Sequence, residues 1–374
     1  MQRVKELLGG SVELDRIPDY GPLDLPEYSK FLEETKTQFY TRWNDLLSKK
    51  EQPINLQYNG YSLDDFQRIK LIGAGNFGNV YLVSNIKTGA FHAMKSVLKT
   101  TVVRLKQVNN ARTEKLVLQC TTCPFTIRLD YFFKDNSYLY FVLPFVRGGD
   151  LFRHLQRSNQ LSELSAMFYL AQVILAIEYL HYMDIIYRDL KPENVLIDHT
   201  GYIKLTDFGF CKRLTRGRTY TICGTPDYIT PETLRSEGYG KGADWWAVGV
   251  LAYELTVGVP PFKDKSDSKR YFKIVSGKYS LPPPLSEELK DLISNVLQID
   301  KTKRFGNMSK GVNDFKTHKW FKPLNWMAVA CRKASPPFTP DVDAENDTRH
   351  FKDLTHRSLR VADHVECGQE FADF

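Results

Sequence analysis

Six short motifs follow one another between residues 73 and 232, and their order and spacing constrain the fold more than any other feature of the chain. They are Gly73-Ala-Gly75-Asn76-Phe77-Gly78-Asn79-Val80, Ala93-Met-Lys95, Glu114, Tyr187-Arg-Asp189-Leu-Lys191-Pro-Glu193-Asn194, Asp207-Phe-Gly209 and Thr230-Pro-Glu232. Each motif alone occurs by chance, whereas all of them in this order rarely would. Together they supply the flexible backbone, the cations and the carboxylates that transfer of a γ-phosphoryl group requires.

Size and composition are those of a soluble globular protein. The 374 residues are enough for a large core and more than one folding unit. A charged fraction of 25% and a hydrophobic fraction of 42% argue against disorder as the main state. The net charge of +7 is modest and is not gathered into a Lys/Arg stripe, so nucleic-acid binding is not expected.

The expected location is the cytoplasm, with the nucleus as a second compartment. No apolar run reaches about 18 residues, so no membrane span is expected. The first eight residues do not resemble a secretory signal, and Gln2 stands where N-myristoylation needs glycine. Cys120 and Cys123 have CxxC spacing without a second pair, which favours ordinary packing cysteines over a zinc or redox site.

The periodicity of apolar residues divides the chain into four parts. Residues 1–65 comprise a leader, an amphipathic helix and a linker; 66–149 read as short strands around one helical stretch; 150–320 are mainly helical; and 321–374 form a tail that wraps the lobes. The expected fold class is α+β, with a small antiparallel β-sheet lobe and a larger, mainly helical lobe. The amphipathic helix, at 28–49, is expected to pack on its own protein through Phe31, Leu32, Phe39, Trp43, Leu46 and Leu47.

The glycine loop predicts a phosphate-binding turn. Because Gly73, Gly75 and Gly78 lack Cβ atoms, the backbone can turn tightly and bring N–H groups close to phosphate oxygens. The same GxGxxG pattern opens a helix in dinucleotide-binding folds, but here a strand-like run follows, which disfavours that alternative. Lys95 on the next strand is within reach of the α- and β-phosphates, and Glu114 is the candidate partner that holds its ammonium group in place.

The second half of the motif series predicts the reacting groups. Asp189 is expected to orient a substrate hydroxyl and to accept its proton late in the reaction, while Lys191 reaches the γ-phosphoryl oxygens. Asn194 and Asp207 offer the oxygen ligands that Mg²⁺ prefers. The spacing of these residues is a stronger signal than the glycine loop alone.

These motifs resemble those of the protein kinases, and lysine at position 191 resembles the serine/threonine kinases in particular. Longer stretches are similar to the AGC group, and the terminal Cys367–Phe374 is similar to catalytic subunits of cAMP-dependent protein kinase, where a final Phe-x-x-Phe docks into the small lobe. The resemblance covers residues 28–374, apart from an insertion between Trp43 and Phe66. It implies a bilobal kinase fold, ATP and Mg²⁺ as cofactors, and protein substrates with basic Ser/Thr motifs. A cAMP-binding regulatory subunit and pseudosubstrate inhibitors are the implied partners.

The resemblance also implies a nucleotide site that extends beyond the motifs. Its cofactor-binding residues are Ile72, Gly73, Ala74, Gly75, Asn76, Phe77, Gly78, Asn79, Val80, Ala93, Lys95, Glu114, Phe145, Val146, Asp150, Leu196 and Phe351. Phe351 resembles the tail aromatic that covers adenine. Glu232 and Arg304 resemble a structural ion pair, and Asp244 resembles an aspartate that braces the backbone of the catalytic loop.

Substrate preference is implied by acids and apolar residues around the site. Glu193 and Glu254 match carboxylates that hold an arginine two residues before the phosphoacceptor, and Asp150 replaces a glutamate that reaches the arginine three before it. An apolar socket for the residue after the acceptor is formed by Ile222, Pro226 and Ile229. Asp150 has a shorter side chain than the glutamate it replaces, and the tail after Phe351 lacks most of the acidic residues found there in the family. Selectivity for an arginine three residues before the phosphoacceptor is therefore expected to be weaker than in the family.

Regulation departs from the family pattern. Thr221 matches the activation-segment phosphosite, and Arg188 and Lys212 match two of its phosphate ligands, but the third, a histidine, is replaced by Asn110. Substitutions on the regulatory surface and at the tail phosphosite are Tyr220, Glu237 and Ala362. An active AGC kinase that cAMP does not control is therefore the alternative. A pseudokinase scaffold is disfavoured, because the motif lysine and both motif aspartates are retained.

Overall fold

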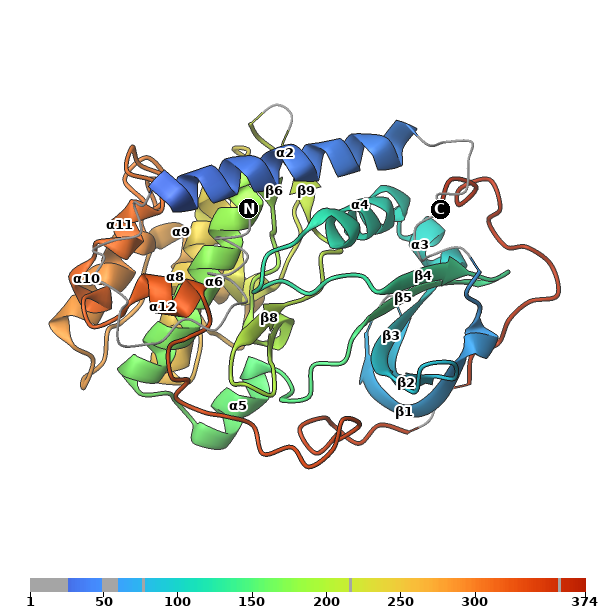
Figure 1. The fold of residues 1–374 in the computed structure, drawn as a ribbon. Coiled ribbons are helices and arrows are strands. Elements are labelled where there is room, and N and C mark those ends of the chain that lie inside the picture. The colour runs from blue at the N-terminus through green and yellow to red at the C-terminus, as the bar shows by residue number, and fades with distance from the viewer. Residues whose placement is uncertain (1–25, 49–59, 76–77, 215–216, 356–357) are drawn as a thin grey trace.

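The computed structural model describes residues 26–48, 60–75, 78–214, 217–355 and 358–374. Residues 1–25 of the predicted leader (1–27), residue 49 of the predicted helix, residues 50–59 of the predicted linker (50–62) and the glycine-loop residues Asn76 and Phe77 lie outside the described residues. Figure 1 shows a small β-sheet lobe and a larger helical lobe, with a long helix lying along both and the tail running back from the large lobe to the small one. The expected α+β bilobal fold is confirmed.

The small lobe is built on a five-stranded antiparallel sheet with the order β1-β2-β3-β5-β4. Its strands are β1 (Phe66–Ala74), β2 (Gly78–Asn85), β3 (Phe91–Leu98), β4 (Tyr131–Lys134) and β5 (Tyr138–Pro144), and its helices are α3 (Lys99–Arg104) and α4 (Val108–Cys120). In the sheet register, Lys95 on β3 lies opposite Val80 on β2 and Phe141 on β5. The sequence therefore places the motif lysine in the middle of the central strand, where neighbours on both sides fix its backbone.

The large lobe consists of helices with short paired strands at its edge. Its helices are α5 (Leu151–Ser158), α6 (Glu163–Tyr182), α7 (Pro231–Leu234), α8 (Gly242–Val257), α9 (Asp267–Ser276), α10 (Glu287–Val296), α11 (Asn313–Lys316) and α12 (Trp326–Ala330). Two antiparallel strand pairs are β6 (Ile185–Ile186) with β9 (Lys212–Arg213), and β7 (Val195–Ile197) with β8 (Ile203–Leu205). Short 3₁₀ turns are η2 (Leu63–Asp65), η3 (Pro192–Asn194), η4 (Pro226–Tyr228) and η5 (Lys319–Phe321).

Helix α6 forms the centre of the large-lobe core. It is apolar around its whole circumference, as a fully buried helix must be, and it packs against α8. Its length and composition would also suit a membrane span, but 83% of the apolar window is buried inside the lobe. The burial identifies α6 as a core helix.

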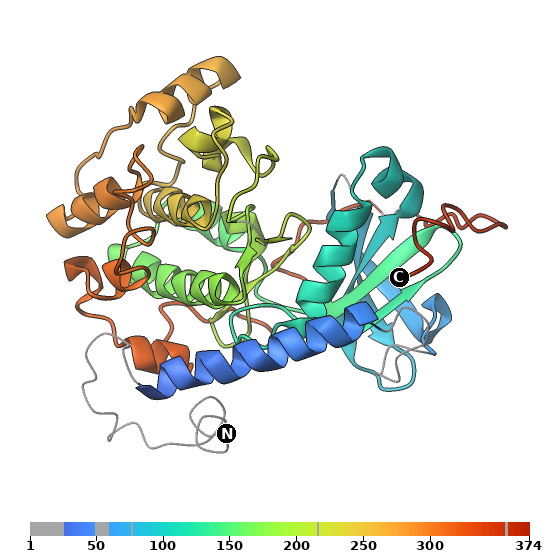
Figure 2. The same cartoon turned by 90° about the horizontal axis from the view of Figure 1, so that it is seen from above.

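The predicted N-terminal helix is present as α2 (Pro26–Ser48) and lies along both lobes (Figure 2). Leu32, Phe39 and Trp43 are buried, as expected for a helix that packs on its own protein. Leu47 contradicts its assignment to the packed face, because 44% of it is exposed. At about 100° per residue it lies about 80° around the helix from Phe39, beyond the edge of the apolar stripe.

The end of the tail docks on the small lobe, as the resemblance implies. Phe371 is buried, and the ring of Phe374 lies 6.2 Å from that of Phe132 on β4. The ammonium of Lys115 on α4 sits over the Phe132 ring and, at 5.7 Å, near that of Phe374. The apolar end of the chain thus covers the junction of α4 and the sheet.

Candidate active site

Lys95 lies at the centre of the inter-lobe site. Its Nζ donates to Glu114 Oε1 at 2.7 Å and to Asp207 Oδ1 at 3.2 Å, so it links the sheet to helix α4 and to the large lobe. Burial alone would lower the pKa of Lys95, but the carboxylates of Asp207 and Glu114 outweigh it and raise that pKa above its ordinary value. The predicted ion pair is therefore present, and the lysine is cationic at neutral pH.

Asp189 is buried and its carboxylate is held by three donors. Asn194 Nδ2 donates to Oδ2 at 2.9 Å, Lys191 Nζ lies 3.0 Å from the same oxygen, and Thr225 Oγ1 donates to Oδ1 at 3.0 Å. Burial raises the pKa of Asp189, and the ammonium of Lys191 opposes that shift. A raised pKa suits a carboxylate that must accept a proton during a reaction. Thr225 lies in Cys223-Gly-Thr-Pro-Asp-Tyr228, a stretch that is similar to the AGC group, but the sequence predicted no role for it.

The catalytic loop is braced from behind by Asp244 of α8. Its carboxylate accepts the backbone N–H groups of Tyr187 and Arg188, at 2.9 and 2.8 Å, and His181 Nε2 lies 2.7 Å away. Arg188 has a φ of +72°, a left-handed conformation that is costly for a side chain with a Cβ. The buried carboxylate therefore fixes a strained backbone immediately before Asp189, which is the structural role that the sequence predicts.

Asp207 is directed toward Lys95 by its own backbone. Its φ is +58°, and the next residue, Phe208, is fully buried against Tyr187, with 5.7 Å between ring centroids. The ammonium of Lys95 lowers the pKa of Asp207, which is therefore ionised at neutral pH.

The donor set beside Asp207 suits Mg²⁺. Asn194 uses its Nδ2 to bind Asp189, which leaves its Oδ1 as the atom able to meet a cation. A carboxylate and an amide oxygen are hard ligands, and Mg²⁺ commonly takes only one or two protein oxygens, with phosphate oxygens completing its shell. Among the residues that the structure describes, no group of three or more His, Cys, Asp or Glu could hold a metal by itself.

The three loop glycines differ in why they are needed. A Cβ on Gly78 would lie 1.7 Å from the carbonyl oxygen of Ser96, and one on Gly73 would lie 3.3 Å from Val80 Cβ, so both are limited by the neighbouring strand. Gly75 faces open space, and its N–H donates to the Gly78 carbonyl at 2.9 Å. Sheet packing explains Gly78 and Gly73, whereas no atom of the described residues lies close enough to Gly75 to require glycine there.

The remaining predicted nucleotide residues lie on β1–β3, on the segment between the lobes, on β7 and on the tail. The ring centroid of Phe351 in the tail lies 5.3 Å from that of Phe145, which directly follows β5, and the two ring planes are 32° apart. Leu196 is on β7, where it pairs in an isolated bridge with Asp150. The other members whose surroundings the structure describes are Ile72, Ala74, Asn79, Val80, Ala93 and Val146. Their nucleotide-binding role stays a prediction.

The acidic residues predicted to bind substrate arginines are in contrasting environments. Asp150 caps helix α5: its carboxylate accepts the Arg153 N–H at 2.8 Å and pairs with Arg153 Nε at 3.1 Å. Glu254 is buried beneath Tyr228, whose hydroxyl donates to it at 2.5 Å, while Glu193 is exposed. Burial, with a smaller contribution from the Glu193 carboxylate, raises the pKa of Glu254 to about 7.

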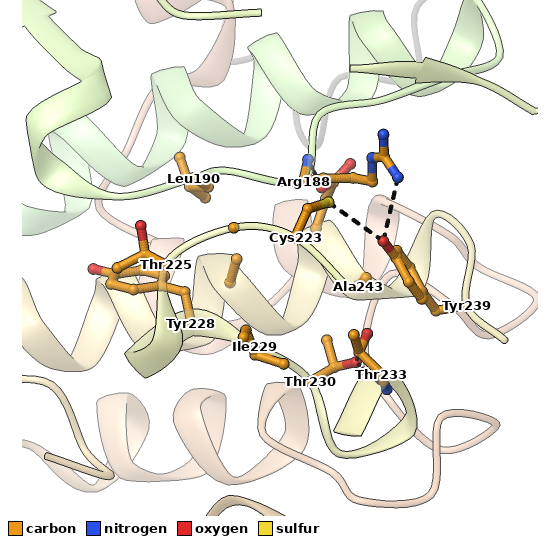
Figure 3. A pocket seen from close by; sticks show the side chains of 13 residues that line it. Arg188, Leu190, Cys223, Thr225, Tyr228, Ile229, Thr230, Thr233, Tyr239 and Ala243 are labelled. Atoms are coloured by element: carbon orange, nitrogen blue, oxygen red, sulfur yellow. Dashed lines mark hydrogen bonds between the residues drawn. The ribbon is translucent and has the colours of Figure 1, made fainter. Parts of the chain in front are cut away.

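The apolar socket is divided between surface and interior. Ile222 is exposed on the loop that precedes η4, and Pro226 is exposed as the first residue of η4. Ile229 is buried, and it lines the pocket drawn in Figure 3 behind that loop. Only two of the three predicted socket residues are therefore open to a peptide in this structure.

The exposed Thr221 lies on a segment held by Tyr239. The Tyr239 hydroxyl donates to the Thr221 carbonyl at 2.5 Å, and Arg188 Nη1 and Cys223 Sγ lie 3.3 and 3.6 Å from that hydroxyl (Figure 3). Lys212 Nζ donates to Thr219 Oγ1 at 3.0 Å. Of the two predicted phosphate ligands, Lys212 thus contacts this segment directly, and Arg188 contacts the Tyr239 hydroxyl that holds it. Tyr239 was not predicted, because nothing in the motif spacing marks it.

Asn110, the third predicted phosphate neighbour, is engaged within its own helix. Its Nδ2 donates to the side chain of Gln107, which precedes α4. A neutral amide with an internal partner is a weak ligand for a phosphate group.

A sheet lobe that carries a Lys–Glu pair, facing a helical lobe that carries a buried loop aspartate and an Asp-Phe-Gly turn, defines a protein kinase. The protein kinase domain model matches residues 66–321, and the chain belongs to that family.

Within the family, the chain is similar to catalytic subunits of cAMP-dependent protein kinases, as the sequence predicts. It is 45% identical over 292 residues to the human "cAMP-dependent protein kinase catalytic subunit PRKX", a match that covers 78% of this chain and 81% of that protein. It is 45% identical over 316 residues to "cAMP-dependent protein kinase catalytic subunit 3" of Drosophila melanogaster, covering 84% of this chain and 54% of that protein. Subunit 2 of the same organism is 37% identical over 353 residues, with 93% and 96% covered. The chain thus spans about half the length of one of these relatives and most of the other two.

Proposed function

We propose that the chain is an active, ATP-dependent serine/threonine protein kinase that transfers the γ-phosphoryl group to Ser or Thr in Arg-containing motifs. The observation that carries the proposal is the joint placement of Lys95, Asp189 and Asp207, each with its supporting partners. Lys95 is paired with Glu114, Asp189 is held by three donors, and the Asp207 carboxylate is ionised beside the lysine. Preorganised charges of this kind contribute most of the rate acceleration in phosphoryl transfer.

The residues divide the work as follows. Lys95 binds nucleotide phosphate oxygens, and Lys191 neutralises charge on the transferred group. Asp189 orients the substrate hydroxyl; as the new P–O bond forms and the bond to the ADP oxygen breaks, the hydroxyl proton passes to its carboxylate. Asp207 and the Asn194 Oδ1 would hold Mg²⁺, which supplies charge neutralisation on the phosphates when bound.

The test is a phosphorylation assay with purified protein, Mg-ATP and Arg-Arg-x-Ser-hydrophobic peptides. Incorporation of phosphate on serine supports the proposal, and an Ala-for-Ser peptide is the control. A protein phosphorylated at Thr221 that binds Mg-ATP but transfers nothing would instead support a scaffold. Parallel assays with a cAMP-binding regulatory subunit, with and without cAMP, would decide whether cAMP controls the enzyme. The surface of this chain on which the regulatory subunit would dock would include the exposed Tyr220. Cytoplasmic and nuclear location stay predictions.

Arginine two residues before the acceptor is expected to matter more than arginine three before it. The Asp150 carboxylate is already committed to Arg153, so an incoming guanidinium must compete for it. Loss of a charged partner from a desolvated contact costs about 2–5 kcal/mol, and rim contacts cost much less. A positional-scanning peptide array measures both positions. Dominance of the third upstream position would contradict the expectation, and Asp150→Glu, with its longer side chain, should increase selectivity there.

Binding of the arginine two residues before the phosphoacceptor is expected to strengthen as the pH rises through 7. Because the pKa of Glu254 is raised to about 7, its carboxyl is largely protonated and neutral below that pH and ionised above it. Between pH of about 6 and about 8, KM for a peptide with this arginine should fall up to about tenfold relative to a peptide with alanine there. Glu254→Gln should remove the pH dependence of this ratio. A wild-type ratio that stays constant with pH would show that Glu254 does not meet the arginine.

Thr221 phosphorylation is expected to activate the enzyme, but with weak coupling to α4. A phosphate carries about −1.5 to −2 charges and would bind Arg188 and Lys212, whereas Asn110 offers only an amide that already bonds Gln107. Asn110→His should increase the activity ratio of phosphorylated to unphosphorylated protein, most clearly below a pH of about 6.5. Asn109→His, at the exposed neighbouring position, is the matched control. An unchanged ratio would place residue 110 away from the phosphate.

A further inference from the structure

Residues 338–354, here called the tail strap, cross from the large lobe to the small lobe. Figure 1 shows this part of the tail passing α5 and continuing toward β1. At one end, Phe338 stacks on His154 of α5, with 4.3 Å between ring centroids; at the other, Leu354 packs against the small-lobe core. Between them, Phe351 lies beside Phe145 at the junction of the lobes. The strap therefore carries the predicted adenine-covering ring on a segment that touches both lobes.

The segment between the lobes is shaped to receive the strap closely. A Cβ on Gly149 would lie 2.6 Å from the carbonyl oxygen of His350, whereas one on Gly148 would lie 2.4 Å from the Ile197 carbonyl oxygen and 2.5 Å from the Pro340 side chain. Gly149 also has a φ of +74°, which glycine adopts without strain. Gly149 thus lets the strap backbone lie directly against the chain that leads into α5.

The large lobe anchors the residue immediately before Phe351. His350 is 7% exposed, and its Nε2 donates to the Asp341 carbonyl at 2.9 Å. Its other ring nitrogen, Nδ1, then carries the lone pair and accepts from Arg157 Nη1 at 3.1 Å. Arg157 lies in the last turn of α5, so a rigid helix fixes the orientation of His350.

The small lobe anchors the strap on both sides of Phe351. Lys70 Nζ donates to Thr348 Oγ1 at 3.2 Å and pairs with Asp353 Oδ1 at 2.6 Å. These partners stand three residues before the ring and two after it. Lys70 is on β1, the strand that leads into the glycine loop.

We propose that Lys70 and Arg157, one from each lobe, are positioning residues that hold Phe351 over the nucleotide. Neither touches the nucleotide or the reacting groups; each acts through the strap. This inference rests on the proposed kinase function, and it extends the nucleotide site to two residues that lie outside every kinase motif in the sequence. It predicts that both residues set nucleotide affinity and leave the chemical step alone.

Steady-state kinetics of the full chain test the proposal. Lys70→Ala and Arg157→Ala should each raise KM for ATP about three- to tenfold, the scale of one partly exposed hydrogen bond or ion pair. Turnover at saturating ATP and KM for the peptide should stay within a factor of about two. Lys70→Arg and Arg157→Lys, which keep a charged donor, should restore most of the affinity, and Lys352→Ala, at an exposed position beside Phe351, is the control.

A second comparison separates positioning from a general structural role. Phe351→Ala should itself raise KM for ATP, and in that background Lys70→Ala and Arg157→Ala should have no further effect, because the ring that they position is gone. Additive losses in the Phe351→Ala background, or an unchanged KM for ATP in the single variants, would overturn the inference. If Arg157→Ala lowers Tm, Lys70→Ala tests the same idea from the other lobe. A wild-type protein that neither binds Mg-ATP nor phosphorylates peptide would overturn the proposed function and this inference together, whereas an active wild type with unaffected variants overturns the inference alone.

Discussion

Replacing Asp207 with alanine is expected to reduce kcat/KM for peptide phosphorylation by about a thousandfold or more, the scale of removing a charge that stabilises the transition state. The reason lies in the electrostatics of the site. The ammonium of Lys95 lowers the pKa of Asp207, so the carboxylate is fully ionised and available to a cation at neutral pH. Removing it leaves Asn194 Oδ1 as the predicted protein ligand for Mg²⁺, and leaves Lys95 with Glu114 as its acidic partner.

Asp207→Asn distinguishes charge from shape. The amide preserves the volume of the side chain but removes the negative charge, so activity should remain close to that of Asp207→Ala. Binding of ATP without Mg²⁺ should change little, whereas the gain in ATP affinity on adding Mg²⁺ should disappear. Lys95→Met is expected to abolish activity by misplacing the phosphates. Asp45→Asn, an exposed acid on α2, is the matched control. Wild-type turnover in both Asp207 variants and in Lys95→Met would show that the active site has been assigned to the wrong residues.

The catalytic constellation could be predicted from the sequence because its members must meet around one triphosphate. The order and spacing of the motifs therefore carry information about which side chains meet, and the Lys95–Glu114 pair between β3 and α4 is an example. The large-lobe core is different. Helix α6 is apolar on all sides, so its periodicity predicts burial but does not identify α8 as its neighbour.

Contacts of a polar side chain that several nearby groups can bind could not be predicted from the sequence. Asp150 was expected to face a substrate arginine, but a carboxylate before a helix can cap that helix, and here it also pairs with Arg153. The amide of Asn110 is similarly taken by Gln107. The strap contacts of Lys70 and Arg157 join residues that are far apart in the chain, and no periodicity or motif in the sequence predicts these pairs. In each case the residue type was visible in the sequence, and the partner was not.

Arg304 supports the activation segment through a buried charge, and its loss is expected to cause the largest fall in stability. The side chain is 0% exposed and forms two parallel bonds to Glu232, at 2.7 and 2.9 Å. It also donates to the carbonyls of Gly242 and Gln298 and stacks on Trp246. One guanidinium thus joins α7, which follows the activation segment, to the start of α8 and to the residues just after α10.

Arg304→Met should lower the free energy of unfolding by about 3–5 kcal/mol, because it leaves the Glu232 carboxylate buried without its partner. Although burial raises the pKa of Glu232, the Arg304 guanidinium outweighs it and holds that pKa below its ordinary value. A depressed folded-state pKa contributes stability above the unfolded pKa of about 4.5 and loses it as the pH falls through the folded value. The loss in free energy of unfolding caused by Arg304→Met should therefore be largest at neutral pH. It should shrink in acid, where Glu232 is protonated in wild type and variant alike. Urea unfolding at several pH values measures this, with Lys303→Met, the exposed neighbour, as the control. A deficit of the same size at all pH values would mean that Arg304 stabilises the lobe by packing on Trp246 rather than by its charge.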